Sequence, residues 1–283
     1  MNGIADRLLV PGANHSGLNQ SPPTGEFVMI LWQVNPTNVS GLLVPTTWDA
    51  SVMTGYAPPF PLNTAQLGFQ NTPGTTTAQM AGSVVGAYLN SLDIPSSNSG
   101  QKMMITPQYE FPSGGMPAPF ADANAVLNGA LDLQVPIATG SDTYVNADLL
   151  FQGPNGVRLS YGVKLFGNGD MRPTTGTTYD APSNSYVFDP PLGPGQQFVT
   201  MTPGTTPTQS APWVGWQHFQ WSTSEAQFAA MLNYMAAQYP GTIQSKNPQD
   251  YLLAEIHLNA EFHYSPSQAE LGWSMRGMEI WVN

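Results

Sequence analysis

The sequence contains no cysteine, few charged residues and no long hydrophobic run. Without cysteine there is neither a disulfide framework nor thiol chemistry. Stability must then come from core burial, which 283 residues with 41% hydrophobic content permit. No apolar run reaches the roughly 18 residues that a membrane-spanning helix needs. Polar and charged side chains interrupt residues 1–20, so a signal peptide is not expected there.

Charge is scarce and mostly negative. Charged residues make up 9% of the chain, against about 25% in ordinary soluble domains. Seven Lys and Arg residues and a net charge of −11 cannot supply the clustered cations that nucleic acids or anionic membranes attract. A neutral polar surface is typical of extracellular proteins and of proteins that bind sugars or assemble laterally. We therefore expect a secreted protein whose leader is absent from this sequence.

Composition divides the chain into an arm and one domain. Proline and glycine interrupt residues 1–25, which predicts an irregular N-terminal arm through which the protein could self-assemble. Residues 26–283 are expected to form a single β-sandwich domain with a Pro/Gly-rich loop over 35–82. A loop that long in a compact domain usually binds a ligand or mediates assembly.

Alternation of apolar and polar residues predicts a series of antiparallel strands. The clearest pair is Thr143–Phe151 and Val157–Phe166, joined by a Gly-Pro-Asn-Gly turn, which indicates a hairpin. Residues 127–138 have a further strand pattern, residues 185–189 and 197–202 have shorter ones, and two long strands close the chain. The fold class predicted is a mainly β, jelly-roll-like antiparallel sandwich.

One amphipathic helix is predicted near residues 223–238. Ser222 and Glu225 have the spacing of a capping box, with Ser222 as N-cap. Apolar residues follow at helical spacing: Phe228, Met231, Leu232 and Met235. This stripe indicates core packing rather than a cofactor site.

The strand at residues 251–264 concentrates scarce polar groups. Period-two alternation places one set on one face: Glu255, His257, Asn259, Glu261 and His263. Three interpretations remain open. The row could be a solvated face that discourages edge pairing, the floor of a ligand cleft, or part of a metal site that lacks an identified third ligand.

Other strands could extend this row. Lys164 lies on the polar side of its strand, and Tyr144, Asn146 and Asp148 on that of another. If the strands meet, one concave face would hold Arg158, Lys164, Arg276, Glu255, His257 and Glu261.

Two kinds of chemistry fit such a face. A lyase would use His257 as base, Tyr144 as acid and an arginine against a substrate carboxylate. A hydrolase would use Glu255 or Glu261, but these lie about 20 Å apart along the strand, so its second carboxyl must come from elsewhere. Substrate binding is assigned to Arg158, Lys164, Arg276, Asn259, His263 and Trp216.

Trp216 belongs to an aromatic-rich stretch before the predicted helix. Exposed tryptophan stacks on sugar rings, but these side chains could equally pack the helix onto a sheet. No phosphate loop, nucleophile elbow or His-Glu-x-x-His helix is present, so no cofactor is expected. Calcium has only weak candidates, at Asp142, Asp148, Asp170 and Asp180, and no loop spacing supports it.

The strand from Glu255 to Phe262 resembles two glycan-active families. It is similar to the Glu-Ile-Asp-x-x-Glu strand of laminarinase-type glycosidases, and its Ile-His pair to the Gln-Ile-His strand of alginate lyases. His257 replaces the Asp of the first motif, the second Glu is displaced, and Glu255 replaces the Gln of the second. Both families are concanavalin A-like jelly rolls. The resemblance covers residues 255–262 of the 283, and implies the fold more strongly than an activity.

Three functions therefore remain open. The first is an extracellular enzyme, a lyase or glycoside hydrolase, that binds and cleaves a polysaccharide. The second is a lectin-like domain that binds glycan without chemistry. The third is a structural virion or appendage subunit, which the Pro/Gly-rich arm and the neutral surface would suit.

Overall fold

The structure is a computed structural model. It describes residues 8–9, 26–33, 65–68, 77–81, 84–90, 102–110, 116–140, 143–168, 176–180, 184–190, 197–263 and 269–283. Within these residues, no helix combines the length and the apolar character needed to cross a membrane.

Two β-sheets form the molecule. The spatial order of the first sheet is β12 (Thr200–Met201), β13 (Trp213–Ser224), β7 (Val126–Thr139), β15 (Glu270–Val282), β5 (Val84–Asn90), β4 (Thr77–Ala81) and β3 (Ala65–Gly68), while β1 (Leu8–Leu9) pairs with β15. The order of the second is β10 (Gly176–Asp180), β11 (Ser185–Asp189), β9 (Arg158–Asn168), β8 (Thr143–Gln152), β14 (Leu252–His263), β6 (Lys102–Glu110) and β2 (Glu26–Gln33). Among the described strand pairs, only β11 with β9 is parallel.

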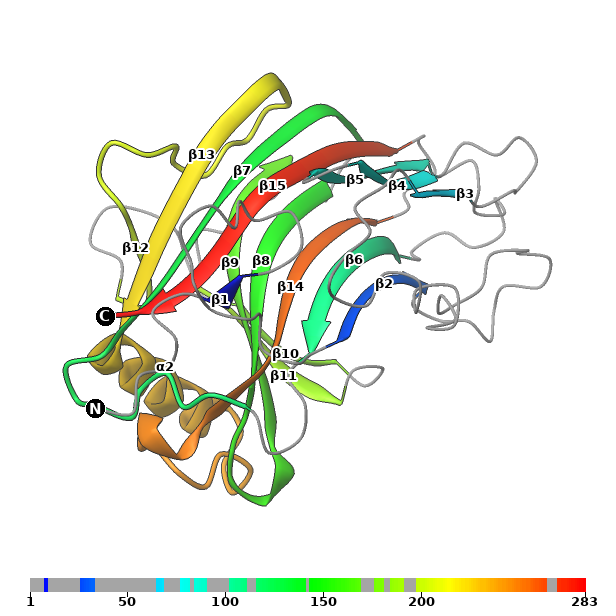
Figure 1. Cartoon of the computed structure of the whole chain (residues 1–283). Helices are drawn as coiled ribbons and strands as arrows, with labels where there is room; N and C mark the ends of the chain where they lie inside the picture. The colour runs from blue at the N-terminus through cyan, green and yellow to red at the C-terminus, as the bar shows by residue number, and fades with distance from the viewer. Residues whose placement is uncertain are drawn as a thin grey trace.

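Helix α2 (Glu225–Gln238) lies beside one end of the curved strands, directly after β13 (Figure 1). Its buried side chains are those of the predicted stripe: Phe228, Met231, Leu232 and Met235. Phe228 stacks on Phe120, with ring centroids 4.5 Å apart, and contacts Phe151 of β8 at 4.6 Å. The stripe therefore serves core packing, as predicted.

The main core lies between the two sheets and continues to the helix. Trp221 and Trp273 come from the first sheet and Tyr161 from the second, and each is at most 2% exposed. Burying side chains of this size stabilises a fold by about 25 cal/mol per Å² of apolar surface. The predicted mainly β sandwich with one helix is confirmed, as is the hairpin of β8 and β9.

The helix begins two residues later than the sequence predicted. Ser224 is the N-cap, and it exchanges side-chain and backbone hydrogen bonds with Gln227 in a capping box. Ser222, the predicted N-cap, still pairs with Asn128 of β7. Pairing with β7 therefore continues β13 through Ser222, and the helix is capped two residues later by Ser224 and Gln227.

Two of the composition-based assignments need correction. Residues 65–68 and 77–81, predicted as loop, form β3 at the sheet edge and β4 beside it, because their short polar–apolar alternation suits strands. Residues 8–9 of the predicted arm form β1. The other residues of the arm and of the 35–82 loop lie outside the described part of the chain, and the single-domain assignment stays a prediction.

Candidate functional site

The polar row of β14 faces away from the core, as alternation predicts. Ile256 and Leu258 are at most 2% exposed within the core cluster. Glu255 and His257 alternate with them and bond to each other on the opposite side. We call this side of the second sheet the polar face. Its described polar members are Tyr144, Asn146, Asp148, Arg158, Lys164, Asp189, Glu255, His257, Asn259 and Glu261.

Strand register brings these residues together from four strands. On β8, Tyr144 lies opposite Glu261 and Asp148 lies opposite His257. On β9, Gly162 lies opposite Asp148. Convergence of β8, β9 and β14 on one face was expected from the sequence, whereas the contribution of β11 was not.

Glu255 sits between two basic side chains. The Arg158 guanidinium donates to Glu255 Oε1 in an ion pair, and His257 Nε2 lies 2.8 Å from Glu255 Oε2. Burial works to raise the pKa of Glu255, but the hydrogen bond and charge of His257, together with Arg158, lower it below its usual value. Glu255 is therefore an ionised anchor of this end of the face.

A second pair occupies the other end of the face. The Tyr144 hydroxyl donates to Glu261 Oε2, and Glu261 is only 4% exposed. Lys164 Nζ lies 5.5 Å from the centroid of the Tyr144 ring, a cation–π distance. Burial, and then the charge of Glu261, raise the pKa of Tyr144 well above its usual value. Tyr144 therefore stays protonated and can donate a hydrogen bond.

Between these pairs, two carboxyl groups meet above Gly162. A Cβ on Gly162 would lie 2.6 Å from Asp148 Oδ1 and 2.8 Å from Asp189 Oδ1. Both oxygens therefore occupy the space that any larger residue would fill. The absence of a side chain at position 162 allows this approach of β8 and β11 across β9.

Asp148 is neutral in this environment. Burial, and then the charge of Asp189, raise the pKa of Asp148 from 3.8 to about 8, although a hydrogen bond from Asn259 acts in the opposite direction. A carboxyl group of this kind carries a proton at neutral pH and can act as a general acid. Asp189, which is partly exposed, provides the neighbouring negative charge.

Several polar atoms around this carboxyl pair are unsatisfied. The side-chain oxygens concerned are buried and accept no hydrogen bond in the described part of the chain: Asn146 Oδ1, Asp148 Oδ1 and Asn259 Oδ1. Asn146 is 4% exposed, and its Nδ2 atom lies 3.6 Å from the same point above Gly162. Buried polar atoms without hydrogen-bond partners are costly. This arrangement therefore favours a polar ligand that supplies the missing partners.

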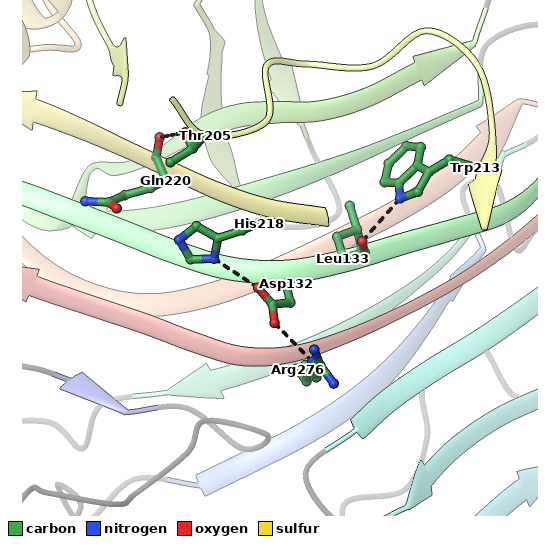
Figure 2. Close-up of polar contacts among 7 residues, drawn as sticks. All are labelled: Asp132, Leu133, Thr205, Trp213, His218, Gln220 and Arg276. Carbon is green, nitrogen blue, oxygen red and sulfur yellow. Dashed lines mark hydrogen bonds and ion pairs between the residues drawn. The ribbon is translucent and has the colours of Figure 1, made fainter. Parts of the chain in front are cut away.

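Arg276 and Trp216 do not join the polar face, contrary to the expectation from sequence. Both lie on the first sheet, where the Arg276 guanidinium carbon is 4.4 Å from the Trp216 ring centroid. Figure 2 shows Asp132 between Arg276 and His218, at 3.0 Å from Arg276 Nε and 2.9 Å from His218 Nδ1. Alternation predicts the face of the strand on which a residue lies, but not the sheet that the strand joins. Arg276 lies on the first sheet because β15 pairs with β7 rather than with β14.

The remaining predicted site residues divide into two groups. Tyr144, Arg158, Lys164, Glu255, His257, Asn259 and Glu261 lie together on the polar face. The His263 side chain lies outside the described residues. Of the aromatic stretch, Trp221 is 1% exposed in the core, so packing rather than sugar stacking explains it.

No metal site is found within the described residues, which hold no group of three suitable ligands. Asp148 lies inside β8 rather than in a turn, so it does not fit the calcium loop considered from sequence. Asp142 and Asp170, and the side chain of Asp180, fall outside the described residues.

Asp189 is the functional candidate that sequence reasoning missed. It ends a short strand whose partner cannot be read from local pattern, because β11 pairs in parallel with β9 across the intervening chain. The available signal was Gly162, a glycine within a strong strand, which often marks close approach of another group.

Comparison with known proteins gives only distant likenesses. No protein-family model matches the chain, and no curated protein matches it. Among solved structures, the family 11 xylanase of Neocallimastix patriciarum has a TM-score of 0.30 at 13% identity, covering 77% of this chain and 95% of that one.

Family 12 glycoside hydrolases give similar values. A cellulase variant derived from Cel12A of Rhodothermus marinus has a TM-score of 0.36 at 13% identity, covering 78% of this chain and 100% of that one. The family 12 xyloglucanase of Bacillus licheniformis has 0.35 at 9%, with the same coverage. The likeness to these structures is thus to glycoside hydrolases of families 11 and 12. At such scores it carries no argument about activity, and the chain is distantly similar to these β-sandwich hydrolases without being assigned to them.

Proposed function

We propose that the polar face of the second sheet binds a polysaccharide and hydrolyses a glycosidic bond. The observation that carries this proposal is the carboxyl pair above Gly162, in which Asp148 is protonated near neutral pH and Asp189 lies beside it. Glycoside hydrolysis needs these two groups, an acid to protonate the leaving oxygen and a carboxylate to assist at the sugar carbon.

The spacing of the pair favours the retaining reaction. Since each Oδ1 atom lies within 2.8 Å of one point, the two oxygens are at most about 5.4 Å apart, which is closer than the ~6.5–9.5 Å of inverting enzymes and leaves the ~5–5.5 Å of retaining enzymes within reach. In this reaction Asp148 donates its proton to the leaving oxygen while Asp189 attacks the anomeric carbon. Asp148 then takes a proton from the water that releases the sugar from Asp189.

The surrounding groups suit a sugar chain. The unsatisfied oxygens of Asn146 and Asn259 can accept hydrogen bonds from sugar hydroxyls, and Lys164 can donate them. His257 lies opposite Asp148 in register and remains a candidate for proton exchange with it. His257 was the first candidate from sequence for the main proton transfer. Asp148 takes this role in the proposal instead, because Nε2 of His257 is bonded to Glu255.

A polysaccharide panel tests the proposal. The parent protein, Asp148→Asn and Asp189→Asn are incubated with neutral and acidic polysaccharides, and new reducing ends and unsaturated products are measured. We expect reducing ends from at least one polymer, and a loss of about 10²–10⁴-fold or more in both variants. Asp122→Asn, in an exposed loop, is the matched control and should keep full activity.

Other results would favour the alternative functions. Unsaturated products would indicate a lyase. Binding without any product in the parent would favour the lectin-like function. If no polymer is bound or cut and the parent assembles into large oligomers, the structural function replaces the proposal.

A further inference from the structure

A pocket of about 270 Å³ lies at the end of the second sheet where the β8–β9 turn and the start of β11 meet the chain after helix α2. We call it the turn pocket, because three turns build it. The β8–β9 turn contributes Asn155, the residues before and in β11 contribute Asn184 and Tyr186, and the chain after helix α2 contributes Thr242 and Gln244. Arg158 lines the same pocket and also bonds to Glu255, so it joins the pocket to the polar face.

The walls of the turn pocket are held in place by contacts between the turns. Asn155 donates to Gln244 across the pocket. The Tyr179 hydroxyl donates to Asn184 Oδ1 at 2.8 Å, and the Tyr186 ring packs edge-on against Tyr239 with centroids 4.7 Å apart. A pocket whose walls are braced in this way loses little entropy when it binds a ligand.

The backbone around the turn pocket is unusual. Among the described residues, Asn155 (φ 58°) and Asn184 (φ 49°) are the non-glycine residues with left-handed conformation, and both line the pocket. Asparagine tolerates this conformation better than most residues, so these turns are stable. Both asparagines line the pocket, and each amide group has a hydrogen-bond partner, Gln244 for Asn155 and Tyr179 for Asn184.

The charged groups that line the turn pocket indicate the class of ligand that it binds. Its described lining contains one cation, Arg158, and no carboxylate. Arg158 uses its Nη2 atom for Glu255, and its Nε and Nη1 atoms bond to no described residue. The planar guanidinium fork recognises carboxylates through paired hydrogen bonds. A ligand with a carboxylate and several hydroxyls fits this combination of arginine, amides and tyrosine.

We infer that the turn pocket binds a carboxylated sugar unit of an acidic polysaccharide. This inference rests on the proposed function, and it names the substrate class of the same site. Arg158 and Gly162 both belong to β9, four residues apart, which is about 13 Å along a strand. That span corresponds to a short oligosaccharide, so the unit in the pocket and the bond near Asp148 belong to one chain.

Matched acidic and neutral ligands test this inference. Tetramers of galacturonate, glucuronate and mannuronate are each compared with their methyl esters, which keep the sugar and remove the charge. Equilibrium binding is measured by calorimetry for the parent and for Arg158→Gln, Arg158→Lys and Thr242→Trp. Arg276→Gln is the matched control, because this arginine is also ion-paired to a carboxylate, that of Asp132, but lies on the other sheet.

The inference predicts that at least one acidic tetramer binds the parent about tenfold more tightly than its ester, a difference of about 1.4 kcal/mol. Arg158→Gln should lose this preference and Arg158→Lys should keep part of it, since the charge remains without the fork. Thr242→Trp should weaken binding of both forms by filling the pocket. Arg276→Gln should behave as the parent does, and thermal melts should show that all variants are folded.

Three results would overturn the inference. They are the absence of a preference for any acid over its ester, a preference that survives Arg158→Gln, and a preference that Arg276→Gln removes equally. The two proposals can fail separately. Acidic tetramers that bind in an Arg158-dependent manner without any cleavage would retain the pocket and reject hydrolysis. A neutral polymer that is cut equally by the parent and by Thr242→Trp would retain hydrolysis and reject the pocket.

Discussion

Gly162 sets the distance between the two carboxyl groups at the centre of the site. Its neighbours on β8 and β11 reach over it from both sides, with oxygens 2.6 and 2.8 Å from the position of a Cβ. Contacts that short do not occur between real atoms, so any side chain at this position must push at least one carboxyl group away.

We therefore predict that Gly162→Ala lowers turnover at least about 10²-fold, because a displacement of about 1 Å has this effect on a reacting group. The control is Gly176→Ala on β10. The atom nearest to its added Cβ is the Cβ of Asp189, 3.8 Å away. Turnover is measured on whichever polymer the panel identifies. Equal activity of the two variants would show that the close approach has no catalytic role.

Asp148 should also make stability depend on pH. Its pKa in the folded protein is raised to about 8 from 3.8, so the folded state holds a proton that the unfolded state releases. The contribution of Asp148 to the free energy of unfolding should then be greatest below about pH 4 and fall as pH rises toward 8, by up to about 1.4 kcal/mol per pH unit.

Urea unfolding of the parent and of Asp148→Asn at several pH values checks this prediction. The variant lacks the titrating group, so its unfolding free energy should vary less between pH 4 and pH 8 than that of the parent. Asp122→Asn, which removes an exposed carboxyl, should follow the parent. Parallel pH curves for the parent and Asp148→Asn would mean that Asp148 has an ordinary pKa.

At the scale of elements, some features could be predicted from the sequence and others could not. The β8–β9 hairpin and the polar row of β14 follow from period-two alternation, which is a local property. The parallel pairing of β11 with β9 depends on contacts distant in sequence, and no local pattern encodes it. Asp189 was therefore missed, whereas Tyr144, Lys164 and Glu261 were placed on the site face.

The helix cap gives a prediction at this scale. Ser224→Ala should lower the free energy of unfolding by about 1 kcal/mol, because the Ser224 side chain accepts a hydrogen bond from the Gln227 backbone. Ser222→Ala should have a much smaller effect, since the N-cap of the helix is Ser224 and not Ser222. Chemical denaturation of both variants distinguishes the two positions, and the reverse order would restore Ser222 as the N-cap.

At the scale of the whole molecule, the scarce charges are divided between the two sheets. Arg158 and Lys164 lie with the buried carboxyl groups on the second sheet, while Arg276, His218 and Asp132 form an exposed cluster on the first (Figure 2). Sequence alone could place each residue on a face of its strand, but the assignment of strands to sheets required the fold. On the polar face, the pKa values of Asp148 and Tyr144 are raised and that of Glu255 is lowered, and perturbed pKa values are a common mark of active sites.

The central claim is that Asp148 holds a proton at neutral pH beside Asp189, ready for acid catalysis. The most direct measurement is a pH titration of the aspartate carboxyl carbons by NMR, in the parent and in Asp148→Asn, and it needs no substrate. We predict one aspartate signal in the parent that titrates near pH 8 and is absent in the variant. If every aspartate signal of the parent titrates below about pH 5, as unperturbed aspartates do, the claim is contradicted.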